Sequence, residues 1–162
     1  DDMVKKKTIC IDFDGVIHDY SKGYQGKDVF GDMVPGSDTA TKVLKEKGWT
    51  IIIYTTRPDT KALRGWLKDK GVLFDYINEN PSQPKDSLNG SKLIADIYLD
   101  DRAVRFNGEW DWIMNDIASF IPWGEKNKID DSKDKMKKQY ESGETYKKRC
   151  LNPFLAEDPQ II

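Results

Sequence analysis

The sequence predicts an α/β fold, a three-layer Rossmann-like sandwich around a mostly parallel sheet. Short apolar runs typical of buried strands alternate along the chain with amphipathic segments of helical spacing. That alternation is the order of a parallel sheet covered by helices. The first run, residues 8–11, ends in Asp12-Phe13-Asp14-Gly15, and polar residues also follow later strands. Since parallel sheets place ligand sites at the carboxyl ends of their strands, this edge is the candidate site.

Each expected element has a local signal. Apolar, β-branched runs predict strands, and apolar residues three and four apart predict helices. Glycine-rich and proline-rich stretches predict loops at residues 15–36 and 78–91. We expect strands at residues 8–12, 49–54, 74–77, 94–99 and, briefly, 103–106. We expect helices from Ser37 or Asp38 to Lys47, from Pro58 in a first turn to Gly71, and over residues 109–120.

Composition restricts the class of protein. The chain has 162 residues, 38% of them hydrophobic, which is enough for one domain with its own core. A net charge of −2 argues against general, charge-driven nucleic-acid binding. No apolar stretch is long enough to span a membrane. Cys10 falls in a buried strand and Cys150 in a polar segment, so we expect no disulfide and a cytoplasmic location.

The end of the sequence differs from the rest. Charged residues dominate from Lys126 to Arg149, and apolar residues are almost absent there. We therefore expect a domain over residues 1–124, and a charged tail over 125–162 that is helical or partly disordered.

Two aspartates stand at the end of the first strand. Residues two apart in a strand point to the same side, so Asp12 and Asp14 share one edge of the sheet. Gly15 permits a tight turn after them. The pattern D-x-D-G also begins many calcium loops, but these require a glutamate at the twelfth position, which is Gly23 here. The pair therefore predicts a site for a divalent cation and a phosphate.

Three further groups fall at strand ends. Thr55 and Thr56 follow the second strand, Lys92 precedes the fourth, and Asp100-Asp101 follows it. With the Asp12-Phe13-Asp14-Gly15-Val16 segment, these resemble the four motifs of the haloacid dehalogenase (HAD) superfamily of phosphohydrolases, in the same order and across roughly residues 7–105.

The resemblance implies catalytic roles. Asp12 is the expected nucleophile that forms an aspartyl-phosphate. Asp14 is the expected general acid and base, because it would protonate the leaving oxygen and then activate water. Thr55 would donate a hydrogen bond to the phosphate, and Lys92 would neutralise charge in the transition state.

The resemblance also implies a cofactor, Mg²⁺, which takes oxygen ligands in octahedral geometry. The expected ligands are the Asp12 carboxylate, the Asp14 main-chain carbonyl and an acid of the pair Asp100-Asp101. Asp101 is favoured as the direct ligand, because relatives with an Asp-Asp-Arg ending commonly use the second acid.

Alternatives stay open for several positions. Thr56 is a rival to Thr55, because strand ends are uncertain by a residue or two. Lys85 is a rival to Lys92, although it lies in a proline-rich loop. Arg57 contacts either substrate or an acid at the sheet edge, and His18 is a packed histidine or lines the site.

The resemblance is to the capless type, since neither gap between the motifs has room for a full cap domain. Residues 16–36 would then be a small flap over the site. Lys92 lies eight residues before Asp100, a spacing similar to the deoxyribonucleotidase and polynucleotide-phosphatase branches. We expect a phosphorylated small molecule, such as a nucleotide, or a nucleic-acid end as substrate. The alternatives are a binding or scaffold protein with an inactive body, and a phosphotransferase to an acceptor other than water.

Overall fold

The computed structural model describes residues 6–87 and 90–128. The chain divides into two units, Asp1–Lys126 and Asn127–Ile162. Within the described ranges, the four strands and the three α-helices lie in the first unit. The charged tail predicted at residues 125–162 lies almost wholly outside the described residues.

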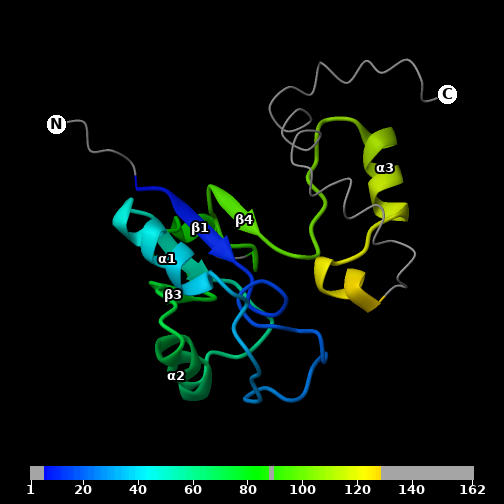
Figure 1. Cartoon of the computed structure of the whole chain (residues 1–162). Helices are drawn as coiled ribbons and strands as arrows, with labels where there is room; N and C mark the ends of the chain where they lie inside the picture. Colours follow the sequence, from blue (N-terminus) through cyan, green and yellow to red (C-terminus); the bar gives the residue numbers. More distant parts are fainter. Residues whose placement is uncertain (1–5, 88–89, 129–162) are drawn as a thin grey trace. The chain divides into compact units, whose positions relative to one another are not determined.

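The first unit contains a four-stranded sheet in which every pairing is parallel (Figure 1). The strand order is β3-β2-β1-β4. The expectation of a mostly parallel, Rossmann-like sheet is therefore confirmed. The strands are β1 (Thr8–Ile11), β2 (Thr50–Ile53), β3 (Tyr76–Ile77) and β4 (Ile97–Leu99).

The central position of β1 determines where the site forms. Ile9 of β1 pairs with Ile51 of β2 on one side and with Ile97 of β4 on the other. The carboxyl ends of these three strands consequently meet at one edge. The polar residues predicted at strand ends follow these three strands: Asp12 after β1, Thr55 after β2 and Asp100 after β4.

The core lies on one face of the sheet. Alternate residues of β1 and β2 point to it because side chains alternate along a strand. They pack with two fully buried leucines of α2 (Lys61–Asp69), and Leu44 of α1 (Ser37–Glu46) packs against the same cluster. The cluster is made mainly of Ile9, Ile11, Phe13, Ile51, Ile53, Leu63, Leu67 and Ile77. Helices therefore flank the sheet and hold β1 rigidly beneath the site.

The start of α2 differs from the sequence expectation, whereas α1 begins at Ser37 as expected. Helix α2 begins at Lys61, so Pro58 precedes the helix instead of lying in its first turn. Thr60 is the N-cap, because its hydroxyl accepts a hydrogen bond from the Leu63 amide (3.1 Å) that would otherwise lack a partner. The N-cap of α1 is Gly36, in the left-handed region at φ 91°, and no side chain caps that helix.

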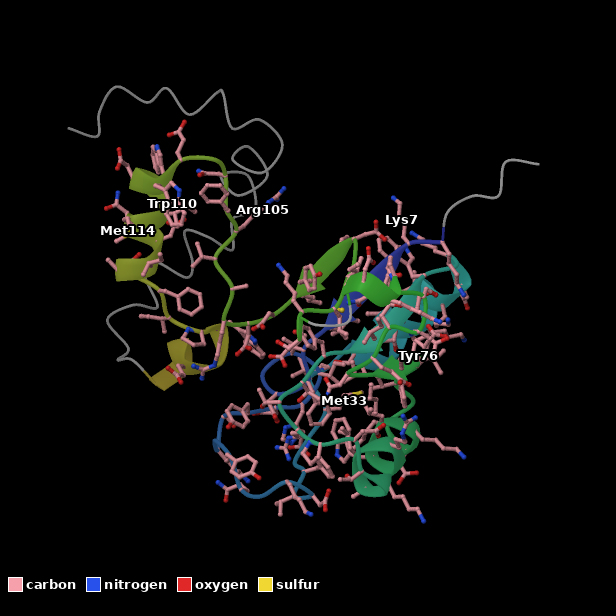
Figure 2. All side chains as sticks on the ribbon, turned by 180° about the vertical axis from the view of Figure 1, so that it is seen from behind. Lys7, Met33, Tyr76, Arg105, Trp110 and Met114 are labelled. Atoms are coloured by element: carbon pink, nitrogen blue, oxygen red, sulfur yellow. The ribbon has the colours of Figure 1, made fainter. Side chains whose placement is uncertain are left out.

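The expected fifth strand at residues 103–106 does not form, and β4 is an edge of the sheet among the described residues. β4 has only three residues and its side chains are largely exposed, so it offers little surface on which a further strand can pack. Helix α3 (Trp110–Ala118) follows, and Trp110 and Met114 project from it into solvent (Figure 2). Two 3₁₀ turns, η1 (Lys85–Ser87) and η2 (Trp123–Lys128), complete the elements.

The predicted flap at residues 16–36 is a loop braced by isolated β-bridges. His18 bridges to Asp14 on one side and to Met33 on the other. The Val34 amide donates to the Ile17 carbonyl oxygen (2.7 Å), which closes the loop at its base. No helix within the described part of the chain has the length and apolar character needed to cross a membrane.

Candidate active site

Three carboxylates meet at the carboxyl edge of the sheet. Asp12 directly follows β1, and Asp100 and Asp101 directly follow β4. The two strands are paired, and the Asp12 amide extends the pairing by donating to the Leu99 carbonyl oxygen (2.9 Å). Each of the three residues offers a carboxylate oxygen, and these oxygens all lie within 4.8 Å of one another. The structure therefore brings together the three acids that the sequence analysis assigned to the metal.

The Asp101 carboxylate packs tightly against the turn after β1. A Cβ atom on Gly15 would overlap it, and Gly15 has a φ of 88°, a conformation that residues with side chains rarely adopt. Asp101 Oδ1 is buried and has no hydrogen-bond partner among the described residues. A buried carboxylate oxygen without a donor is costly unless a cation or a proton meets it. This oxygen is thus an acceptor that a metal ion would satisfy.

The pKa values of the cluster indicate that its carboxylates repel one another. Burial and then the negative charge of Asp100 raise the pKa of Asp12 to about 7, although the Phe13 amide donates to its Oδ1 (2.8 Å) and opposes the rise. Burial and Asp100 also raise the pKa of Asp101. A positive charge placed among these carboxylates would therefore favour their ionised form. An all-oxygen ligand set of this kind suits Mg²⁺.

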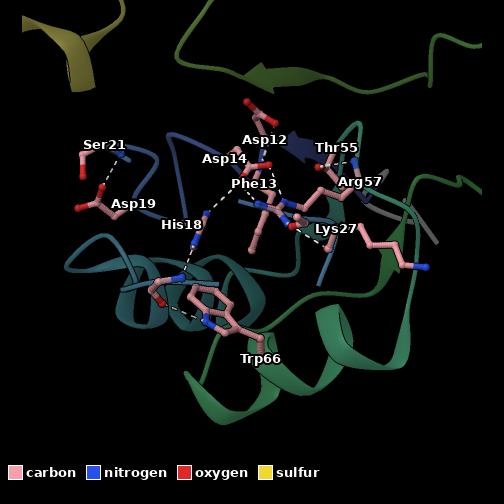
Figure 3. A network of polar contacts seen from close by, with 12 residues as sticks. Asp12, Phe13, Asp14, His18, Asp19, Ser21, Lys27, Thr55, Arg57 and Trp66 are labelled. Atoms are coloured by element: carbon pink, nitrogen blue, oxygen red, sulfur yellow. Dashed lines mark hydrogen bonds and ion pairs between the residues drawn. The ribbon is translucent and has the colours of Figure 1, made fainter. Parts of the chain in front are cut away.

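Asp14 is held by different partners (Figure 3). Arg57 donates to it twice, from Nε to Oδ2 (2.7 Å) and from Nη2 to Oδ1 (3.0 Å). His18 Nδ1 lies 2.8 Å from Asp14 Oδ1. Burial alone would raise the pKa of Asp14, but the hydrogen bonds from His18 and Arg57 and the charge of Arg57 outweigh it and lower the pKa. The structure thus presents Asp14 as an ionised carboxylate.

Thr55 lies directly beyond β2, where its hydroxyl oxygen accepts a hydrogen bond from the Arg57 amide (3.1 Å). Its own amide donates to Asn78 Oδ1 (2.8 Å). Because the hydroxyl oxygen is the acceptor in the contact with Arg57, the hydroxyl proton stays available for a phosphate oxygen. Thr56, the alternative, is exposed and has no such support.

Lys92 lies beside an aromatic ring of β4. Its Nζ lies 5.0 Å from the ring centroid of Tyr98, and the side chain belongs to an exposed residue. Among the described residues, neither Lys92 nor its rival Lys85 forms an ion pair. The catalytic role of Lys92 stays a prediction.

Two residues at the site were not assigned from the sequence. Asn78 has a φ of 54° and fixes both sides of the Thr55 turn, because its Nδ2 also donates to the Arg57 carbonyl oxygen (3.2 Å). Its signal in the sequence was an asparagine directly after a short apolar strand. Trp123 of η2 donates its indole N–H to the Gly15 carbonyl oxygen. Nothing in the sequence linked this tryptophan to a turn more than 100 positions earlier.

The comparisons with known proteins add two likenesses. No family model matches the chain, and no curated protein matches it. Among solved structures it is similar to a conserved protein from Bacteroides thetaiotaomicron, with 24% identity, a TM-score of 0.49, and coverage of 70% of this chain and 90% of that chain. It is also similar to the D,D-heptose 1.7-bisphosphate phosphatase from B. bronchiseptica, which was crystallised with magnesium and phosphate. That likeness has 27% identity, a TM-score of 0.35, and spans 50% of this chain and 53% of the phosphatase.

Neither likeness carries the functional argument, since both TM-scores are below 0.5. The sheet order and the site decide the fold. A parallel sheet of order β3-β2-β1-β4 carries Asp12 after its inner strand β1 and the Asp100-Asp101 pair after β4. The chain has a Rossmann-like α/β fold with an acidic cluster at the carboxyl edge of its sheet. Of the motif residues, Asp12, Thr55 and the Asp100-Asp101 pair follow β1, β2 and β4, and Lys92 precedes β4.

Proposed function

We propose that the chain is a Mg²⁺-dependent phosphomonoesterase of the HAD type, which acts through an aspartyl-phosphate on Asp12. The observation that carries this proposal is the cluster of Asp12, Asp100 and Asp101, with its raised pKa values and the unpartnered Asp101 oxygen. Three converging carboxylates that repel one another have no stabilising role in a fold without a cation. The cluster lies at the sheet edge where α/β proteins bind their ligands.

The cation would be held by the carboxylates of Asp12 and Asp101, with Asp100 next to them and the main-chain carbonyl of Asp14 as the further ligand that the resemblance implies. When bound, Mg²⁺ supplies positive charge that lowers the repulsion between the carboxylates and an incoming phosphate. Gly15 keeps space for the Asp101 carboxylate by lacking a Cβ atom.

In the first half-reaction, an Asp12 carboxylate oxygen attacks the phosphorus. A new O–P bond forms on Asp12, and the bond from phosphorus to the leaving oxygen breaks. Thr55 donates its hydroxyl proton in a hydrogen bond to a phosphate oxygen, for which its contact with the Arg57 amide orients it. Lys92 would neutralise charge in the transition state, the role that the resemblance implies for it.

In the second half-reaction, Asp14 accepts a proton from water, which then cleaves the aspartyl-phosphate and releases inorganic phosphate. The ionised state of Asp14 suits this role as a base. Protonation of the leaving oxygen by Asp14 requires that it first receive a proton, and an aryl phosphate does not need this step because its leaving group is already stable as an anion. Alkyl phosphates are therefore the more demanding test of Asp14.

The proposed substrates are nucleotides or nucleic-acid terminal phosphates. Between β1 and β2 the structure has the flap and α1 but no inserted domain, so the site is accessible to a bulky substrate. Tyr24 in the flap is 61% exposed, and its ring centroid lies 5.5 Å from the Arg57 guanidinium carbon. An exposed aromatic ring beside the site supports recognition of a planar base by stacking.

A panel of phosphate esters tests this function. Phosphate release is measured with and without Mg²⁺ from an aryl phosphate, 5′- and 3′-mononucleotides, a 3′-phosphorylated oligonucleotide and a phosphopeptide. The proposal predicts Mg²⁺-dependent release that Asp12→Asn abolishes, with the nucleotide or oligonucleotide the best substrate. Release that survives Asp12→Asn contradicts the mechanism, and preference for the phosphopeptide contradicts the substrate class.

A further inference from the structure

A single buried arginine connects the candidate site to the flap. Arg57 is 3% exposed, although arginine is rarely buried without full pairing. Its guanidinium donates to both oxygens of Asp14 through Nε and Nη2, and through Nη1 to the carbonyl oxygens of Gly26 (2.8 Å) and Lys27 (2.9 Å). The first pair of bonds holds a site carboxylate and the second holds the middle of the flap. One planar group therefore links Asp14 to the flap, although Arg57 itself lies 30 to 43 positions away from these partners in the sequence.

Aromatic rings surround this guanidinium. The rings of Phe13, Tyr24 and Phe30 lie with their centroids 5.2–5.5 Å from the guanidinium carbon. Phe13 belongs to the segment between the two site aspartates, whereas Tyr24 and Phe30 belong to the flap. Such contacts stabilise a cation that has been removed from water. The Arg57 side chain is accordingly only 2% exposed, whereas the Asp14 side chain keeps 16% of its surface exposed.

His18 provides a second connection of the same kind. Its Nε2 accepts a hydrogen bond from the Gly31 amide (2.7 Å), so the ring proton lies on Nδ1 and is donated to Asp14 Oδ1 (2.8 Å). Gly31 is itself held from the other side, because its carbonyl oxygen accepts from the Trp66 indole (3.2 Å). Asp14 consequently receives three hydrogen bonds, two from Arg57, which also binds the flap, and one from His18, which belongs to the flap.

The flap is attached mainly through the segment that follows β2. Arg57 holds Gly26 and Lys27, Thr60 donates to Asp28 Oδ1 (2.7 Å), and Trp66 holds Gly31. Three anchors within ten positions of the chain make the flap follow the position of this segment. Arg57 is the one anchor among the three that also contacts a predicted catalytic residue.

We propose that Arg57 is a positioning residue that couples the flap to the orientation of Asp14. This inference rests on the proposed phosphatase function for its kinetic consequence, but not for its structural one. Lysine cannot replace this arginine, because one ammonium group lacks the planar set of donors that reaches a carboxylate and two carbonyl oxygens together. Loss of the guanidinium therefore releases the flap and frees the Asp14 carboxylate at the same time.

The chain offers a matched control in Arg64. Its Nε and Nη2 donate to the two oxygens of Asp59, each at 2.7 Å, in the same bidentate arrangement. That pair is exposed and touches neither the flap nor the carboxylate cluster. Arg64→Lys thus makes the same chemical change at the surface.

The test compares Arg57→Lys, Arg57→Ala and Arg64→Lys by amide hydrogen exchange and by aryl-phosphate kinetics with Mg²⁺. We expect faster exchange in residues 17–34 of both Arg57 variants, where the amides of Asp19, Gly31 and Val34 are hydrogen-bonded. We expect kcat to fall about 100-fold with KM nearly unchanged, which is the size of effect that misplacement of a catalytic group produces. Added guanidinium should restore part of the kcat of Arg57→Ala, and Arg64→Lys should match the unmodified protein in every measurement.

The opposite results overturn the inference. Unchanged exchange in the flap of a folded Arg57→Lys variant removes the coupling, and an effect on KM alone makes Arg57 a substrate-binding residue. If Arg57→Ala does not fold, the hydrogen exchange and kinetics of Arg57→Lys alone test the inference. If the unmodified protein releases no phosphate, the proposed function fails, and the exchange measurement still decides whether Arg57 holds the flap.

Discussion

The charge of the carboxylate cluster leads to a quantitative prediction about Asp12→Asn. The substitution keeps the shape of the side chain and removes its charge. Burial and Asp100 raise the pKa of Asp12 from its ordinary value of 3.8 to about 7. At about 1.36 kcal/mol for each pH unit, ionising this carboxyl in the folded protein costs up to about 4 kcal/mol. Solvent screens part of this repulsion at a carboxyl that is not fully buried, which leaves about 2 kcal/mol.

The sign of the pH dependence follows from the direction of that change. Because the pKa of Asp12 is higher in the folded protein than in the unfolded chain, the folded protein binds more protons between pH 4 and 7. Asp12 therefore lowers the free energy of unfolding as the pH rises through this window. Asp12→Asn has no such group, so it should match the unmodified protein at pH 4 and exceed its stability by about 2 kcal/mol at pH 8 without metal.

Thermal unfolding in the presence of a chelator measures this difference. For a chain of this size, 2 kcal/mol corresponds to a rise in Tm of about 4–8 °C. Addition of Mg²⁺ should raise the Tm of the unmodified protein and leave that of Asp12→Asn nearly unchanged. The exposed Asp86 provides the control, since Asp86→Asn should show neither effect. An Asp12→Asn variant that is less stable than the unmodified protein at pH 8 would refute the repulsion argument.

Three other substitutions have expected outcomes. Thr55→Val removes the hydroxyl donor and should lower kcat about 10- to 100-fold in phosphate-release assays, the value of a hydrogen bond to a charged group; an unchanged kcat assigns the phosphate contact elsewhere. Gly15→Ala forces a Cβ atom into the Asp101 carboxylate at a φ of 88°, so calorimetry should show weakened Mg²⁺ binding, and unchanged affinity would contradict the packing described here. Leu67→Ala leaves a cavity at a fully buried position and should cost about 2–5 kcal/mol in urea unfolding, whereas a loss below about 1 kcal/mol would place Leu67 outside the core.

The sheet and the acidic cluster could be predicted from the sequence because both depend on short-range patterns. Ile51, Ile52 and Ile53 form an apolar run that only a buried strand explains, and all three are fully buried in β2. Asp12 directly follows the apolar run of β1, and Asp101 lies one residue further from the end of β4. Once the strands were known to be parallel, the carboxyl ends of β1 and β4 had to place these acids at one edge.

The partners of Asp14 could not be predicted, because they depend on contacts between distant segments. Arg57 is 43 positions from Asp14, and its other acceptors are main-chain carbonyls, which every residue has. That an arginine has an exposed fraction of only 3% cannot be inferred from its neighbours in sequence. His18 lies four positions from Asp14, yet its role depends on the fold of the loop that brings Gly31 to its Nε2.

The fifth strand was wrong for a related reason. Residues 103–106 have a composition suited to a strand, but a strand needs a neighbour to pair with. The available edge was β4, which has three residues and exposed side chains. Helix α2 begins at Lys61, later than expected, because the Thr60 side chain caps the helix. Pro58 has no side-chain oxygen that could act as a cap.

Detection of a covalent phosphoenzyme is the most direct test of the account. The protein is mixed with Mg²⁺ and an aryl phosphate, quenched in acid, and reduced with borohydride, which converts an aspartyl-phosphate to homoserine. Mass spectrometry of the peptides then locates the modified residue. The account predicts Mg²⁺-dependent homoserine at position 12 and none in Asp12→Asn. Rapid turnover with no modification at Asp12, or modification at Asp14 instead, would contradict Asp12 as the nucleophile.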